Sequence, residues 1–311
     1  MSILDRFSTV TFPLGRKLPT LDEVAKASQH AEKLGFYSIN LPMVTSSFRS
    51  LDALTLLPAM VAATSTIRIA IDAIPVFLLP PFAWAKYFAS LDVISGGRVI
   101  VGMCLGYGEE AFGVVGVNQK NRGKIADEQV EVITRLWTED SVTHEGEFYT
   151  LKNAAIDPKP LQKPYPPIWW GGRTKSIPRA ARYCQYLNTL WPTLDEVRNE
   201  YIPLLKQETQ KWGTSTKLST WLFCRVTPDQ EMTNDEIDQW FTGVINGEVK
   251  VTPSDVSVAG SPQQCAEALK RYMEAGIDRF VLDFQRHSVD PTEAFMEQTS
   301  LFVEKVAPLL E

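Results

Sequence analysis

Cysteine and histidine are scarce in this chain of 311 residues, and neither is clustered. The four cysteines lie far apart, with no Cys-x-x-Cys pair and no Cys/His cluster. The sequence therefore indicates neither a disulfide framework nor a zinc site. We expect a reduced, cytoplasmic protein without a bound metal.

Long apolar runs and an excess of basic charge are also absent. No run approaches 18 apolar residues, and the N-terminus MSILDRFSTV lacks a basic segment followed by an apolar core. We therefore expect neither a membrane span nor a signal peptide. A net charge of −6, with acids and bases interspersed, argues against a nucleic-acid or membrane partner, since both need a basic patch. The expected ligand is a small molecule.

Apolar residues make up 44% of the chain, which is enough for one large core. Barrels of alternating strands and helices routinely form one domain at this length, so we predict a single domain over residues 1–311. Short apolar segments alternate with segments of helical period about eight times, the number at which a parallel sheet closes into a barrel. We predict a (β/α)8 TIM barrel with strands at 7–14, 36–41, 67–76, 98–103, 168–170, 186–190, 218–226 and 278–284.

Local signals add detail to this barrel. Thr20 and Glu23 form a capping box that opens a helix to Leu34. Residues 141–151, SVTHEGEFYTL, have the alternation and central glycine of a β-hairpin appended outside the main sheet. Residues 246–261 have no strong pattern, which is typical of an insertion loop over a barrel site.

The stretch from Ser95 to Gly116, SGGRVIVGMCLGYGEEAFGVVG, has the pattern of a buried strand that leads into a ligand loop. Gly102, Gly106 and Gly108 lack a Cβ, so the backbone can take positive φ and let a flat ring approach closely. The alternative is that these glycines only turn the chain.

Motifs along nearly the whole chain occur in an order that is typical of one family. They are LDVISGGRVIVGMCLGYGEEAFGVVG, NRGKIADEQVEVITRLW, EGEFYTL, PKPLQKPYPPIWWGG, RAARY and AGSPQQCAEALKRYMEAGIDRFVL. Together they resemble the bacterial-luciferase-like superfamily of flavin- and deazaflavin-dependent oxidoreductases. The resemblance implies a (β/α)8 barrel with the flavin ring at the carboxyl ends of the strands, reduced FMN or coenzyme F-420 as cofactor, and a homodimer.

The resemblance assigns two cofactor residues near the central stretch. It places Tyr107 beside the flavin ring, as a candidate catalytic residue, and Arg122 near the cofactor phosphate. A cation just before a helix is slightly unfavourable against the helix dipole, so a purely structural Arg122 needs an acidic partner such as Asp127 or Glu128. The fit between guanidinium and phosphate favours the anchoring role, and the structural role stays open.

The turn after PPIWWGG is a second candidate for the phosphate. It opens a helix, so its free N–H groups and the helix dipole favour an anion. Each of its hydroxyls taken singly is as readily an ordinary helix N-cap, but the basic residues in the same turn favour phosphate. The residues concerned are Gly172, Arg173, Thr174, Lys175 and Ser176.

Relatives in this family carry a non-prolyl cis peptide in the third strand, behind the flavin ring, and here that position falls near Asp72-Ala73. Both residues are therefore candidates for contact with the ring. A buried, unpaired carboxylate costs free energy or raises its pKa, so Asp72 is unusual if only packing matters. We hypothesise ring contact or proton transfer by Asp72, with a salt bridge at the barrel rim as the alternative.

Large side chains near the predicted strand ends suggest an apolar substrate cavity, although any one of them is more often part of a core. Met43-Val44 stands where luciferase-type members place an acid and a histidine, so the usual general base is absent. The candidate pocket residues are Phe12, Met43, Phe48, Trp84, Trp170 and Trp191.

The leading hypothesis is a monooxygenase in which reduced FMN, supplied by a separate flavin reductase, and O2 oxidise a small, largely apolar organic substrate. Hydride transfer with coenzyme F-420 is the alternative, since it needs the same barrel and phosphate site but no oxygen. A catalytically silent flavin-binding protein is a third reading, motivated by Met43-Val44.

Overall fold

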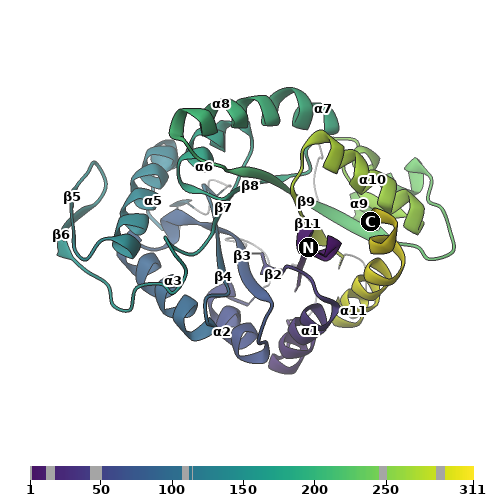
Figure 1. The fold of residues 1–311 in the computed structure, drawn as a ribbon, viewed down its shortest axis with the longest axis horizontal. Coiled ribbons are helices and arrows are strands. Elements are labelled where there is room, and N and C mark those ends of the chain that lie inside the picture. The colour runs from purple at the N-terminus through teal and green to yellow at the C-terminus, as the bar shows by residue number, and fades with distance from the viewer. Residues whose placement is uncertain are drawn as a thin grey trace.

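Eight parallel strands close into a barrel in the computed structural model, which describes residues 2–11, 18–42, 51–106, 112–113, 115–244, 251–284 and 291–311. The strands follow the order β11-β1-β2-β3-β4-β7-β8-β9, and β9 pairs with both β8 and β11, which closes the sheet. Helices form a ring around the strands (Figure 1). The predicted (β/α)8 barrel is confirmed.

The barrel strands are short and alternate with the surrounding helices along the chain. The strands are β1 (Phe7–Val10), β2 (Ser38–Leu41), β3 (Arg68–Pro75), β4 (Val99–Cys104), β7 (Ile168–Gly171), β8 (Tyr186–Leu190), β9 (Lys217–Val226) and β11 (Arg279–Asp283). The helices are α1 (Leu21–Leu34), α2 (Ala53–Ala63), α3 (Pro81–Ser95), α5 (Arg122–Thr138), α6 (Ile177–Tyr183), α7 (Leu194–Glu196), α8 (Ile202–Trp212), α9 (Asn234–Val244), α10 (Pro262–Ala275) and α11 (Pro291–Leu301).

Successive side chains along each strand point alternately into two cores, one between the barrel and the helices and one inside the barrel. On β3, Ile69 and Ile71 point outward into the large core between barrel and helices, whereas Ala70 points into the barrel. Helix ends follow the predicted signals: Thr20 and Glu23 form the capping box of α1, and Gly35 ends that helix at φ 85°. The local sequence therefore determines where this helix begins and ends.

The predicted hairpin is confirmed as β5 (Val142–Glu145) and β6 (Thr150–Ala154), which project beside α5 (Figure 1). Glu128 of α5 holds it: its carboxylate accepts hydrogen bonds from the N–H groups of Phe148 and Tyr149 at 3.0 and 2.7 Å. The His144 ring lies 3.1 Å from the same carboxylate. Glu128 is therefore fully engaged in anchoring the hairpin.

The interpretation of residues 246–261 as a loop without pattern is wrong at 258–260, and residues 246–250 lie outside the described residues. A 3-10 turn at Pro253–Asp255 leads into a further strand, β10 (Val258–Gly260), which pairs parallel with β9. A strand of 3 residues is too short to show a period in the sequence.

Strand β3 bulges toward β4 and β7 at Asp72-Ala73. The pairing of β3 with β4 shifts between Ile71 and Ile74, and the Asp72-Ala73 peptide bond is cis, as predicted. A Cβ on Gly102 would lie 2.0 Å from the Ile71 carbonyl oxygen. Gly102 thus makes room for the backbone of β3, and the expectation that it makes room for a flat ring is wrong. Gly106 does adopt positive φ (71°), and Gly108 lies outside the described residues.

Replacing Gly102 by alanine should lower the free energy of unfolding by about 1 to 3 kcal/mol, because the added methyl group overlaps a backbone atom of the neighbouring strand. Urea unfolding of the variant measures this loss. Gly113→Ala is the matched control, since a Cβ there meets nothing within 4 Å. Equal stability of the two variants would contradict the close packing of β3 on β4.

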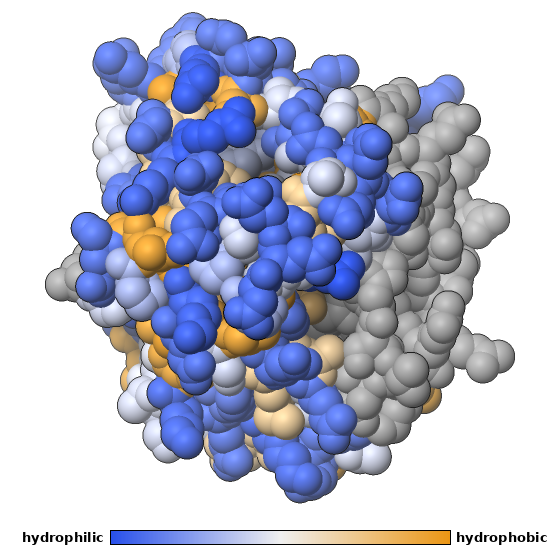
Figure 2. All heavy atoms as spheres, turned by 90° about the vertical axis from the view of Figure 1, so that its right-hand side faces the viewer, coloured by the Kyte–Doolittle hydropathy of each residue, from blue (hydrophilic) through white to orange (hydrophobic). Residues whose placement is uncertain are grey.

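One side of the molecule is mostly hydrophilic, with small, separated apolar patches (Figure 2). This agrees with the interspersed charges of the sequence. Within the described ranges, no helix is long and apolar enough to cross a membrane.

Candidate active site

Asp72 lies inside the barrel on β3 and is 3% exposed. Its Oδ2 accepts two hydrogen bonds, from Asn40 Nδ2 on β2 at 3.1 Å and from Asn188 Nδ2 on β8 at 2.7 Å. Asn40 from the neighbouring strand β2 and Asn188 from β8, across the barrel, thus meet at one carboxylate oxygen. Barrel closure therefore creates this site from three strands that are distant in the sequence.

Two hydroxyl groups determine which way the asparagine amides point. Ser38 Oγ donates to Asn40 Oδ1 at 2.6 Å, and Ser219 Oγ donates to Asn188 Oδ1 at 3.0 Å. Because both amide oxygens accept a hydrogen bond, both NH2 groups face Asp72. Sequence reasoning missed these residues, although a single asparagine in the apolar strands SINL and YLNTL is a signal, since buried amides need partners.

Burial raises the pKa of Asp72 to about 6, and the hydrogen bonds from Asn188 and Asn40 oppose that rise. Across the described residues no lysine, arginine or histidine forms an ion pair with Asp72, so the alternative of a rim salt bridge is not realised there. The nearby Cys104 thiol is neutral, because burial raises its pKa to about 12. Asp72 therefore changes its protonation near neutral pH without a compensating cation among the described residues.

Arg122 is the first residue of α5, so the prediction that it precedes the helix is wrong. The 3-10 turn Gln119–Asn121 runs directly into the helix, and Arg122 Nη1 donates to the Gln119 carbonyl at 3.1 Å. Asp127 pairs with Arg179 at 2.6 Å, and Glu128 holds the hairpin. Among the residues whose positions are described, no carboxylate pairs with Arg122, so the structural role has no acidic partner.

The turn at residues 172–176 is less open to an anion than the sequence suggests. The N–H of Gly172 donates to the Asn188 carbonyl at 3.1 Å and the N–H of Ser176 to the Arg173 carbonyl at 2.8 Å, so these groups are not free. Arg173 forms an ion pair with Glu196, which compensates its charge. The prediction of free N–H groups is therefore wrong at two of the five positions.

The hydroxyl groups of this turn, in contrast, make no hydrogen bond to any described residue. Ser176 precedes α6 without capping it, and Thr174 likewise has no partner, so the N-cap alternative is not realised. A Cβ on Gly172 would lie 2.3 Å from Ser176 Oγ, so glycine is required for this hydroxyl to occupy its position. Thr174 and Ser176 remain available to a ligand.

Arg179, to which sequence reasoning gave no role, connects the two candidate phosphate elements. From the first turn of α6 it donates to the Gly123 carbonyl in the first turn of α5 at 2.8 Å and pairs with Asp127. Its guanidinium also lies 4.8 Å from the ring of Trp170. Arg179 therefore holds the first turns of α5 and α6 side by side, with Arg122 on one and the hydroxyl-bearing turn before the other.

The aromatic candidates occupy different environments. Trp84 and Trp170 are 0% exposed within the large core. Trp84 Nε1 donates to the Val76 carbonyl, whereas the indole N–H of Trp170 has no acceptor among the described residues. Trp191 directly follows β8, is half-buried and has φ 46°, a conformation that is rare outside glycine and clusters at functional sites. Its ring packs on Phe223 and Phe241 at 5.1 and 5.3 Å. Its indole N–H has no acceptor in the described part of the chain.

Four candidate residues lie outside the described residues, so their positions are not described: Phe12, Met43, Phe48 and Tyr107.

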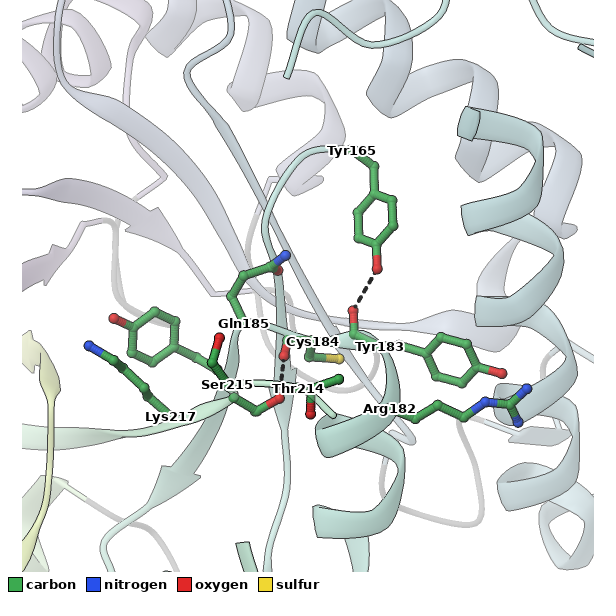
Figure 3. A pocket seen from close by; sticks show the side chains of 10 residues that line it. Tyr165, Arg182, Tyr183, Cys184, Gln185, Thr214, Ser215 and Lys217 are labelled. Atoms are coloured by element: carbon green, nitrogen blue, oxygen red, sulfur yellow. Dashed lines mark hydrogen bonds between the residues drawn. The ribbon is translucent and has the colours of Figure 1, made fainter. Parts of the chain in front are cut away.

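A cavity of about 410 Å³ lies at the opposite end of the barrel, where β8 and β9 begin (Figure 3). Several of its polar groups already have partners within the chain. The Tyr165 hydroxyl donates to the Tyr183 carbonyl, Lys217 pairs with Asp278, and Arg182 pairs with Glu131. In parallel barrels catalytic groups gather at the carboxyl ends of the strands, so this cavity is not the candidate active site.

Comparison with known families decides the assignment of the chain. Residues 6–252 match the model of a family described as luciferase-like monooxygenase. The chain belongs to this family. The match covers β1 through α9, and therefore includes Asp72, Arg122 and the turn at 172–176.

Some of the similar proteins depend on reduced FMN and others on coenzyme F-420, the two cofactors that the sequence suggests. An FMNH(2)-dependent dimethylsulfone monooxygenase of Pseudomonas putida is 28% identical over 50% of this chain and 45% of that protein, so the match spans less than half of that relative. An F-420-dependent glucose-6-phosphate dehydrogenase of Microbacterium testaceum is 25% identical over 90% of both chains. The structure of monooxygenase RslO1 from Streptomyces bottropensis superposes with a TM-score of 0.83 at 22% identity, over 97% of this chain and 99% of that one. This likeness shows the shared fold.

Proposed function

We propose that the chain is a flavin-dependent oxidoreductase, and more specifically a monooxygenase that uses reduced FMN and O2 on a small, largely apolar substrate. One observation carries the proposal: Arg122 has no carboxylate partner among the described residues and begins a helix that Arg179 holds beside the hydroxyls of Thr174 and Ser176. A guanidinium that no described carboxylate pairs with, two hydroxyls and a helix N-terminus together suit a phosphate monoester.

The remaining residues fit the ring portion of FMN. The flavin ring carries N–H donors and carbonyl acceptors, and Asp72 has one carboxylate oxygen, Oδ1, that accepts no hydrogen bond from the described residues. Trp191, which follows β8, forms an apolar aromatic cluster with Phe223 of β9 and Phe241 of α9. A phosphate anchor, a polar contact for the ring and an apolar surface for the substrate are the three things that the reaction requires of the protein.

In this proposal the reduced cofactor supplies two electrons, so that one oxygen atom of O2 enters the substrate and the other leaves as water. Arg122, Thr174 and Ser176 bind the phosphate, and Arg179 keeps their two helices together. Asp72 holds or releases a proton next to the ring. The aromatic cluster excludes water from the substrate. The proposal has four further parts: contact of Tyr107 with the ring, a flavin reductase as partner, a homodimer, and a single domain over residues 1–311.

Hydride transfer with coenzyme F-420 is the second candidate. It is favoured by the dehydrogenase of Microbacterium testaceum, which is similar over 90% of both chains. This cofactor also carries a phosphate and a flavin-like ring, so the same residues would hold it, but no oxygen is consumed.

Separate titrations of the purified chain with oxidised FMN and with coenzyme F-420 test the proposal. We expect FMN to bind more tightly, because the monooxygenase reading requires FMN in the site. Tighter binding of F-420 would replace the first candidate with the second. Binding of neither cofactor would refute both.

A further inference from the structure

The polar chain inside the barrel is directional, and its two asparagine amides both donate to one atom. Further out, Ser8 Oγ lies 2.7 Å from Ser38 Oγ, and the Leu187 carbonyl lies 3.4 Å from Ser219 Oγ. On one side, Ser38 donates to Asn40 and Asn40 donates to Asp72 Oδ2. On the other side, Ser219 donates to Asn188 and Asn188 donates to the same Oδ2. The second carboxylate oxygen, Oδ1, receives no hydrogen bond from any described residue, although the side chain is almost fully buried.

We propose that Asn40 and Asn188, oriented by Ser38 and Ser219, are positioning residues that fix Oδ2 of Asp72 and reserve Oδ1 as the proton-exchanging atom for the bound cofactor. This inference rests on the proposed function only for the identity of the bound cofactor, and the roles of Asn40 and Asn188 do not depend on it. The asymmetry has a chemical reason, since an amide NH2 is a donor at any pH and Oδ2 therefore never needs a proton. A proton that binds to Asp72 goes to Oδ1, the oxygen that has no donor among the described residues.

The surroundings of Asp72 contain few groups that can interfere with this titration. Strands β1, β2 and β7 and helix α2 carry no ionisable side chain. The Cys104 thiol on β4 stays neutral. Besides Asp72, the described barrel strands carry one more carboxylate at their carboxyl ends, Asp283 on β11. On β9, Cys224 and Arg225 lie near the carboxyl end, and burial raises the pKa of the Cys224 thiol. The remaining ionisable groups on these strands lie toward the amino ends: Arg68, Tyr186, Lys217 and Arg279.

The experiment follows the carboxyl C=O band of Asp72 by difference infrared spectroscopy of the full chain between pH 4 and 9, with Asp72→Asn identifying the band. The wild type should titrate with a midpoint at about 6. Asn188→Leu removes a donor that favours the charged form, so its midpoint should rise by about one pH unit or more. Ser219→Ala keeps the Asn188 amide but removes the hydroxyl that orients it. The midpoint of this variant should therefore rise by less than that of Asn188→Leu.

Thr220→Val is the matched control. Thr220 neighbours Ser219 on β9, and its buried hydroxyl faces the other way and donates to the Thr189 carbonyl at 3.2 Å. This variant should leave the midpoint unchanged. If Asn188→Leu does not fold, Ser219→Ala and Ser38→Ala decide the same point. A midpoint that none of these variants moves would overturn the positioning role.

A second arm repeats the titration with saturating FMN, or with coenzyme F-420 if FMN does not bind. Occupation of Oδ1 should move the midpoint of the wild type, and a bound cofactor that leaves the midpoint unchanged would overturn the role of Oδ1. Binding of neither cofactor would refute the proposed function and the exchange with a cofactor, whereas the first arm would still decide the roles of Asn40 and Asn188.

Discussion

Replacing Arg122 by alanine should weaken the binding of FMN by roughly ten- to a hundredfold and leave the binding of riboflavin almost unchanged. A charge-assisted hydrogen bond between guanidinium and phosphate contributes about 1.5 to 3 kcal/mol, and each 1.4 kcal/mol is about a factor of ten in affinity. Riboflavin has the same ring without the phosphate. Fluorescence titration of both ligands against wild type and variant measures the difference.

Lys124→Ala is the matched control for Arg122→Ala. Lys124 is a cation in the same first turn of α5, but it is exposed and pairs with Glu147 of the hairpin at 3.1 Å. Its loss should change neither affinity by more than about twofold, as is usual for a surface ion pair. An Arg122→Ala variant that loses affinity for FMN and riboflavin equally would show that Arg122 supports the helix and does not anchor a phosphate.

Replacing Asp72 by asparagine should stabilise the protein at pH 8 and have almost no effect at pH 4. Burial raises the pKa of Asp72 from 3.8 to about 6. Because the folded state binds the proton more tightly than the unfolded state, the contribution of this group to stability is greatest below pH 4 and is lost as the pH rises through 6. At about 1.4 kcal/mol per pH unit, the charged carboxylate costs about 3 kcal/mol at pH 8.

Asparagine keeps the shape of the side chain and can still accept from Asn40 and Asn188 through its carbonyl oxygen. Urea unfolding at pH 4 and pH 8 measures the difference between variant and wild type. Asp22→Asn is the control, since Asp22 is exposed and should show no comparable gain. A gain in stability that is the same at both pH values would mean that the charge of Asp72 is not its cause.

The sequence predicts the barrel well because its helices and strands differ in period and their ends carry local signals. The capping box at Thr20 and the glycine after α1 lie within a few residues of the structure that they determine. The strand β10 escaped prediction because 3 residues cannot establish a period. Local patterns therefore determine the elements of this chain when the elements are long enough.

The candidate site was predicted only in part, because its geometry depends on contacts between distant residues. Asp72 was identified from its strand position and the resemblance, but Asn188 is 116 positions away and meets it only when the barrel closes. Arg179 was missed because its three partners lie on two other elements. Gly102 was assigned to the ligand although its space belongs to β3, which a sequence does not reveal before the bulge is known.

A crystal structure of the chain with bound FMN is the most direct test of the central claim that the carboxyl ends of the strands hold a flavin through its phosphate. The account predicts the phosphate within hydrogen-bond distance of Arg122 and of the hydroxyls of Thr174 and Ser176, with the ring next to Asp72. FMN bound elsewhere, for example in the cavity between Tyr165 and Lys217 at the amino ends of the strands, would contradict it.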